Sequence, residues 1–340
     1  MVEEEHICRV CLGTEDDGPL VQPCACRGTA KWAHKHCVDH WRRTAVKSNA
    51  AYRCGQCLGR YCDALSIELL SARLQDQRMD GESTSLTLDS LARELQDQGK
   101  ADEAEPLFRR VLEAEREILG GRHPDTLSSI NRLGRLLDFK GEFVAAEPLL
   151  REALEGRRDT LGNRHPHTLT SINLLGLLLD GQGKYAAAGS LLREAMWVAR
   201  ETLGYRHRST LTYTHNLGIS LMDKGDLAAA EPLLRKALEL ERKTLGDQHP
   251  STLVSVSNLG RLLKAKGDLT AAEPLLRRAL EGWRLTLGDR HPSTLMSMNM
   301  LSLLLKDKGD LAAAELLLRE ALEGQRETLG NRHPDTLASI

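Results

Sequence analysis

Cysteine is absent from most of this 340-residue chain, because all eight cysteines lie within its first 62 positions. An excess of charge is absent too, since 46 Lys and Arg are balanced by 48 Asp and Glu. A broad nucleic-acid footprint needs a clear basic excess, so we expect no nucleic-acid partner. Uncharged apolar runs of about 18 residues and a cleavable signal sequence are also missing, which predicts a soluble protein without membrane insertion.

Motifs for nucleotide binding and for nucleophilic catalysis are missing as well. The chain holds no Walker sequence, no dinucleotide fingerprint and no Ser-His-Asp pattern. A reducing compartment keeps thiols reduced, so clustered cysteines in such a chain favour metal binding over disulfides. We therefore expect a metal-binding protein of the cytoplasm, with the nucleus as the alternative location.

Eight potential zinc ligands stand in the first 57 positions, in the pattern C-x2-C, C-x-C, H-x2-C, C-x2-C. They are Cys8, Cys11, Cys24, Cys26, His34, Cys37, Cys54 and Cys57. Tetrahedral Zn²⁺ prefers thiolate and imidazole, and a structural site takes four of them. The pattern therefore predicts two zinc ions in closed sites, which stabilise a fold and leave no position for a catalytic water.

The spacing and the residues between the ligands resemble the RING-CH (RING-variant) finger of membrane-associated RING-CH ubiquitin ligases. The run from Pro23 to His34 contains the P-C-x-C-x-G-[ST]-x-K-aromatic-x-H sequence of that family, and the step from Cys37 to Trp41 matches C-[LV]-x-x-W. Tyr61 fits the aromatic residue at the end of the family pattern.

This resemblance implies a cross-braced fold with one zinc on each of two ligand sets. The sets are Cys8, Cys11, His34 and Cys37, and Cys24, Cys26, Cys54 and Cys57. It also implies that the finger docks a ubiquitin-charged conjugating enzyme through Val10 and Trp41. Such a finger performs no covalent chemistry, because it accelerates transfer by positioning. Ordinary core packing of Trp41 is the competing interpretation.

Two residues leave other functions open. Leu58 follows the last ligand, where many active RING fingers carry Arg or Lys, so a non-enzymatic protein-interaction scaffold is an alternative function. Tyr52 lies two residues before Cys54, as it would in a plant-homeodomain finger, so a histone reader in the nucleus is another.

From about residue 84 the sequence repeats every 42 residues, most visibly at a loop histidine. The histidines are His123, His165, His207, His249, His291 and His333. A fixed period of this size is typical of a solenoid of supersecondary units. Each unit reads as a helix pair, and the pairs are predicted to start near residues 84, 126, 168, 210, 252 and 294.

Cap and turn residues support this assignment. We expect the first helices to be capped by Asp125, Ser251, Ser293 and Asp335, and the second helices by Asp226, Asp268 and Asp310. Glycines at 141, 183, 225, 267 and 309 are expected in left-handed conformations at the ends of the first helices.

Small residues recur where the helices of a pair must approach closely, as at Gly134 and Ala146. This pattern resembles the tetratricopeptide repeat, and the 42-residue length and the T-L-G-x-x-H-P-x-T-L loop resemble kinesin light chains. The resemblance implies an inner groove lined by the first helices, where protein or peptide substrates would bind. The candidate groove residues are Asn131, Arg135, Asn173, His215, Arg261 and Asn299. The recurring Asn could instead bond a neighbouring helix, and that interpretation stays open.

The predicted fold is mainly α, with a small cross-braced two-zinc RING-CH finger followed by an α-solenoid of tetratricopeptide-type helix pairs. We assign the finger to residues 1–62, a linker or capping helix to 63–83, and the repeat array to 84–340. The array would comprise six helix pairs and a seventh cut short at Ile340. The leading function is a RING-type E3 ubiquitin transferase whose partners are a ubiquitin-conjugating enzyme and array-bound substrates.

Overall fold

The computed structural model describes residues 20–21, 33–34, 37, 40, 81–97 and 99–329. The chain divides into two compact units, Met1–Thr160 and Leu161–Ile340. Six of the eight predicted zinc ligands, the docking residues Val10 and Trp41, and the seventh repeat lie outside the described residues. Of the proposed linker or capping helix at 63–83, only residues 81–83 are described, and they belong to the first helix of the array.

Two short strands are described in the N-terminal segment. Strand β1 (Leu20–Val21) pairs antiparallel with β2 (Ala33–His34), with Leu20 opposite His34 and Val21 opposite Ala33. This pairing brings the backbone at His34, a predicted zinc ligand, beside the segment that precedes the Cys24–Cys26 pair.

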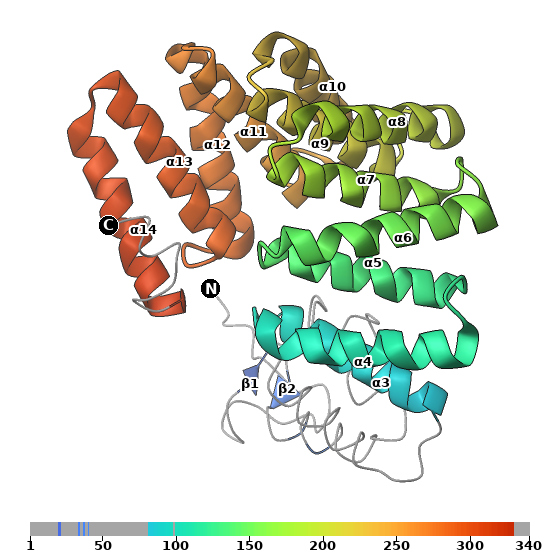
Figure 1. Ribbon diagram of the computed structural model, residues 1–340. Coiled ribbons are helices and arrows are strands. Elements are labelled where there is room, and N and C mark those ends of the chain that lie inside the picture. Colours follow the sequence, from blue (N-terminus) through green and yellow to red (C-terminus); the bar gives the residue numbers. More distant parts are fainter. Residues whose placement is uncertain are drawn as a thin grey trace. The chain divides into compact units, whose positions relative to one another are not determined.

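Six helix pairs fill the rest of the described chain (Figure 1). The first unit contains α3 (Gly81–Asp97), α4 (Ala101–Leu119), α5 (Pro124–Phe139) and α6 (Phe143–Leu161). The second unit contains α7 (Pro166–Gly181), α8 (Tyr185–Leu203), α9 (Arg208–Asp223), α10 (Leu227–Leu245), α11 (Pro250–Ala265), α12 (Leu269–Leu287), α13 (Pro292–Lys308) and α14 (Leu311–Leu329). The first helix of each pair begins two or three residues before its predicted start, and the helical solenoid expected from the period is confirmed.

The caps of the first helices correct one prediction. Asp125, Ser251 and Ser293 do not cap these helices, and Asp335 lies outside the described residues. The loop histidine two positions earlier is the cap, and its Nδ1 accepts the backbone N–H of that residue at 3.1–3.3 Å. His165 and His207 cap α7 and α9 in the same way at 3.2 Å.

Proline is compatible with the early start in four of the first helices, and α9 starts at the same position with Arg208. Pro124, Pro166, Pro250 and Pro292 occupy the first helical position, where the fixed φ suits the helix and no N–H is needed. The residue after the proline is therefore already inside the helix, and its free N–H turns back to the histidine ring.

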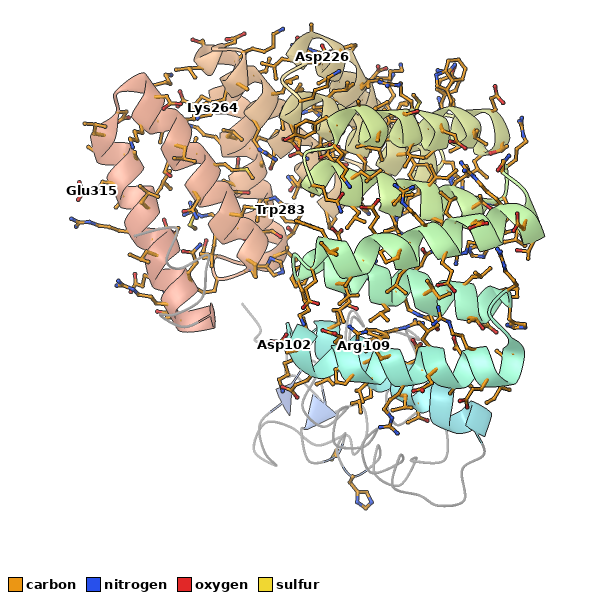
Figure 2. All side chains as sticks on the ribbon, in the orientation of Figure 1. Asp102, Arg109, Asp226, Lys264, Trp283 and Glu315 are labelled. Carbon is orange, nitrogen blue, oxygen red and sulfur yellow. The ribbon has the colours of Figure 1, made fainter. Side chains whose placement is uncertain are left out.

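The caps of the second helices and the glycine turns match the prediction. Asp226, Asp268 and Asp310 accept from the backbone N–H three residues later at 3.0–3.2 Å (Asp226 is labelled in Figure 2). The glycines that end the first helices have φ between 74° and 88°, a region that L side chains rarely adopt.

Within each unit, the core lies between the helices of each pair and between successive pairs. Leucines such as Leu133 and Leu175 are buried, and each contributes about 1.5–3 kcal/mol by leaving water. At Gly176 an added Cβ would lie 2.9 Å from Cδ2 and Cγ of Leu192, so the glycine lets α7 and α8 approach closely. No helix in the described ranges is long and apolar enough to cross a membrane.

Candidate functional site

The first helices carry the predicted groove residues, and the structure divides them into two groups. Asn131, Asn173 and His215 are buried, with 5%, 7% and 8% of their surface exposed. Asn299 and Arg261 are half-buried, and Arg135 is exposed. In this conformation a partner could therefore contact Arg135, and it could contact Arg261 and Asn299 in part.

The buried members in the second unit form hydrogen bonds between successive first helices. Asn216 Nδ2 on α9 donates to Asn173 Oδ1 on α7 at 2.8 Å. Asn258 Nδ2 on α11 lies at hydrogen-bond distance from His215 Nε2 on α9. These contacts are the helix-to-helix bonding that the sequence left as an alternative for the recurring polar position, and peptide binding by these residues stays a prediction.

His215 is held neutral by its surroundings. Burial, with a smaller contribution from the charge of Arg261, lowers the pKa of His215 to about 4. Arg261 Nη1 donates to Asn258 Oδ1 at 3.2 Å, so the amide nitrogen of Asn258 faces the ring and donates to Nε2. The proton of the neutral ring then lies on Nδ1, 3.5 Å from Ser255 Oγ.

The first-helix surface of the second unit mixes both signs of charge. Lys264 Nζ lies 2.7 Å from an Asp307 carboxylate oxygen (Lys264 is labelled in Figure 2). Ser220 Oγ donates to Asp180 Oδ1 at 2.5 Å, and burial raises the pKa of Asp223. A mixed lining of this kind selects no single charge along its length.

A pocket of ≈ 210 Å³ lies between α9, α10 and α11 in the second unit. It is lined by Arg206, Arg208, Leu211, Thr212, His215, Glu241, Thr244, Leu245, Ser251 and Val254. Arg206 and Arg208 are exposed, whereas Glu241 is only 3% exposed, and burial raises the pKa of its carboxyl. Apolar walls, hydroxyl groups and two exposed guanidinium groups therefore meet in one place.

Of the residues that line this pocket, the sequence predicted a binding role for His215, as a groove residue. It missed Arg206, Arg208 and Glu241. The signal in the sequence that could have found them is that positions 208 and 241 depart from the residues of the other repeats. Arg208 occupies the helix-starting position that holds proline in neighbouring repeats, and Glu241 corresponds to Ala199 and to Trp283, which is labelled in Figure 2. A position that changes from Ala to Glu to Trp while remaining buried marks a junction that differs between repeats.

The zinc module is described only in part. His34 lies in β2, and the half-buried Cys37 lies in a helical turn. The described residues contain no group of three or more candidate ligands, and they include only two of the eight predicted ones. The donor set of seven thiols and one imidazole has the chemistry that zinc prefers, and its assignment as ligands stays a prediction.

Family models match both parts of the chain. The RING-variant domain model matches residues 8–57, the span from the first to the last predicted ligand. The tetratricopeptide repeat model matches residues 83–159, 140–201, 209–282 and 256–327. RING-variant domains bind zinc.

Curated relatives match short stretches of the chain. The E3 ubiquitin-protein ligase MARCHF5 of Xenopus laevis is 37% identical over 62 residues, which are 17% of this chain and 22% of that protein. The probable E3 ubiquitin ligase SUD1 of Arabidopsis thaliana is 45% identical over 40 residues, 12% of this chain and 4% of that protein. The chain thus spans less than a quarter of the length of these relatives.

Solved structures resemble the helical array. A Podosopora anserina protein assigned as a kinesin light chain, with nearly identical tetratricopeptide-like repeats, has a TM-score of 0.51 and 30% identity over 61% of this chain and 98% of its own. BtubC (BKLC) from P. vanneervenii has a TM-score of 0.52 and 25% identity over 71% of this chain and 94% of its own. The chain therefore belongs to the tetratricopeptide repeat family, with kinesin-light-chain-like repeats that follow an N-terminal RING-variant domain.

Proposed function

We propose that this chain is a RING-CH-type E3 ubiquitin ligase whose helical array recruits protein substrates. The observation that carries the proposal is the RING-variant match over residues 8–57, which includes all eight predicted ligands, on the same chain as a protein-binding repeat array. The alignment with MARCHF5 over 62 residues supports the same activity. It also favours this function over a histone reader.

Two zinc ions would stabilise the N-terminal finger. Cys8, Cys11, His34 and Cys37 would hold one ion, and Cys24, Cys26, Cys54 and Cys57 the other. Zinc in a closed structural site supplies folding energy and no nucleophile. The finger would span residues 1–62, and 63–83 would link it to the array at 84–340.

The activity of such a finger is positional. Val10 and Trp41 would contact the conjugating enzyme and hold its ubiquitin thioester in a reactive geometry, so no residue of this chain forms a covalent intermediate. A central aromatic contact in a docking surface is typically a hot spot whose truncation costs 2 kcal/mol or more.

Substrates would bind to the array. The reduced cysteines that this function requires favour the cytoplasm, with the nucleus as the alternative location. Arg135, Arg261 and Asn299 are the predicted groove residues with exposed surface. Recruitment by the array would replace the membrane placement that positions other RING-CH ligases near their substrates.

An autoubiquitination assay of the full chain with a panel of conjugating enzymes tests this proposal. We expect ubiquitin transfer with at least one enzyme, and loss of transfer in Trp41→Ala with zinc content unchanged. If Trp41→Ala also loses zinc, Trp41 is a core residue and the docking assignment is wrong.

Leu58 specifically favours the second candidate, a protein-interaction scaffold without ligase activity. Many active RING fingers carry a basic residue at this position, and Leu58 removes it. Absence of transfer with every conjugating enzyme, together with transfer by Leu58→Arg, would establish the scaffold and identify the missing cation as the reason.

A further inference from the structure

A recurring ion pair ties the loop before a helix pair to the end of that pair at three places in the array. The loop arginine binds an acidic residue 37 positions later, and the N–O distances are 2.9–3.1 Å. The pairs are Arg122 with Asp159, Arg164 with Glu201, and Arg290 with Glu327. The acid neutralises the loop cation at each of these three junctions.

A second ion pair recurs between successive second helices. Arg116 binds Glu152 at 2.7 Å, and Arg284 binds Glu320 at 2.6 Å, in each case 36 residues apart. In both kinds of pair an acid 36 or 37 residues later in the sequence neutralises an arginine.

Both acids are replaced by lysine at the junction of α8, α9 and α10. Lys243 stands 37 residues after Arg206, and Lys236 stands 36 residues after Arg200. The two lysines share Glu239, at 3.0 Å and 2.7 Å, and together they lower the pKa of that carboxyl to about 2.

The arginines at this junction are left without carboxylates. Arg200 lies 4.0 Å from the ring centroid of Trp197 and 4.8 Å from that of Tyr205, in two cation–π contacts. Within the described part of the chain, neither Arg206 nor Arg208 has an acidic partner. Glu239 thus binds the two lysines, Arg200 stacks on two aromatic rings, and the charges of Arg206 and Arg208 are left without a carboxylate partner among the described residues.

The two arginines without partners line the pocket between α9, α10 and α11. Leu211 and Val254 form apolar walls beside them, and the Ser251 and Thr212 hydroxyls also line it. Glu241 is the carboxyl that lines the pocket, and it is 3% exposed and bonded to Ser255. An anion is therefore favoured at the arginine rim and disfavoured near Glu241.

We propose that Arg206 and Arg208 bind the phosphate of a phosphoserine or phosphothreonine in a partner polypeptide, with a neighbouring apolar side chain against Leu211 and Val254. Guanidinium groups bind phosphate through paired N–H donors, and a phosphoryl group carries about −1.5 to −2 charge near neutral pH. That charge matches two arginines without partners better than a single carboxylate does. The inference rests on the proposed function in one respect, because it gives the chemistry of the substrate that the array would recruit.

The test uses the full chain and a fluorescent degenerate peptide library with a fixed central phosphothreonine. Matched libraries carry Thr or Glu at the same position. We expect binding of the phosphorylated library, and a loss of about tenfold or more in affinity for Arg206→Ala and for Arg208→Ala, because each removes charge-assisted hydrogen bonds.

Lys243→Glu is the decisive variant, because it recreates the acid that neutralises the loop arginine in other repeats. It removes neither arginine, and we expect it to weaken binding to the same extent as Arg206→Ala. Arg290→Ala is the matched control, since it deletes an equivalent arginine that is already paired with Glu327, and binding should be unchanged.

Equal binding of the three libraries would overturn the phosphate assignment, and preference for the Glu library would make the site a carboxylate site. Binding that survives both Arg208→Ala and Lys243→Glu would place the ligand elsewhere. The assay contains no ubiquitin, so phosphopeptide binding without ligase activity would contradict only the proposed function, and the reverse result only this inference.

Discussion

At the scale of single residues, one missing methyl group decides how closely two helices of a pair pack. At Gly218 an added Cβ would lie 2.7 Å from Leu234 Cδ2 and 2.8 Å from Leu234 Cγ. At Gly189, in α8, the nearest atoms to such a Cβ are Arg193 guanidinium nitrogens at 3.5 Å. The same substitution therefore has opposite consequences at two helical glycines.

We expect Gly218→Ala to lower the free energy of unfolding by about 1–3 kcal/mol, because the crowded leucine branches near its backbone and must shift. Gly189→Ala is the matched control and should stabilise the protein by about 0.5–1 kcal/mol, since alanine loses less backbone entropy in a helix. Urea denaturation followed by circular dichroism measures both. A stabilised Gly218→Ala would show that the helix contact is looser than the structure has it.

The buried His215 predicts a dependence of stability on pH. Its folded pKa of about 4 lies below the ordinary histidine pKa of 6.5, so the unfolded chain binds a proton first as the pH falls. The contribution is fully present above pH 6.5 and is lost between 6.5 and about 4.

His215→Asn, which installs the residue that stands at this position in three other repeats, at Asn131, Asn173 and Asn299, removes this titration. We expect wild type to lose more stability than His215→Asn between pH 7 and pH 5, by an amount on the order of 1–2 kcal/mol. Because other groups titrate equally in both proteins, the difference between them isolates the histidine. Parallel stability curves for the two proteins over this range would mean that the ring is hydrated.

At the scale of elements, the first helices depend on a histidine cap in place of the usual Ser, Asp or Asn. His249 Nδ1 accepts from the Ser251 backbone N–H at 3.1 Å, and Pro250 supplies the first helical residue. The cap therefore requires that Nδ1 of the histidine ring carries no proton, so that it can accept the hydrogen bond.

We expect His249→Ala to destabilise the array by about 0.5–2 kcal/mol, since the N–H of Ser251 loses its partner. His249→Asn keeps a short acceptor at the same position and should recover most of that loss. Thermal denaturation of the three proteins at neutral pH provides the comparison. Equal losses in both variants would show that the ring acts by packing and not by capping.

At the scale of the whole molecule, the zinc module and the array are expected to be stabilised by different means. The predicted ligands all precede residue 58, whereas the described helical core begins at α3. A segment of about 60 residues buries little apolar surface, so metal must contribute to its folding.

Elemental analysis of the purified chain should therefore give two zinc ions per molecule. Cys26→Ser should lower the zinc content and unfold the finger, while the helical circular dichroism signal stays near that of wild type. A single zinc ion, or a collapse of the helical signal in this variant, would contradict separate folding of the two parts.

The sequence by itself determined the features that depend on local chemistry and on period. Helix pairs follow from the 42-residue repeat, Asp226 caps its helix through a contact three residues away, and Gly225 adopts φ 88° because no side chain opposes it. The spacing of the cysteines also identified the zinc module, since ligand order reflects metal geometry, and the ligand and docking assignments remain predictions because most of these residues lie outside the described ones.

Only the tertiary structure decided which polar residues are available to a partner. Asn173 and His215 have the same register as a groove residue, yet bonds to Asn216 and Asn258, 43 residues away in each case, remove them from the surface. The sequence did not predict the histidine caps, because a ring nitrogen accepts a hydrogen bond only where the folded backbone places an N–H group beside it. Arg206 has lysine at position 243, where the equivalent loop arginines have an acid 37 residues later, and only folding brings those pairs together.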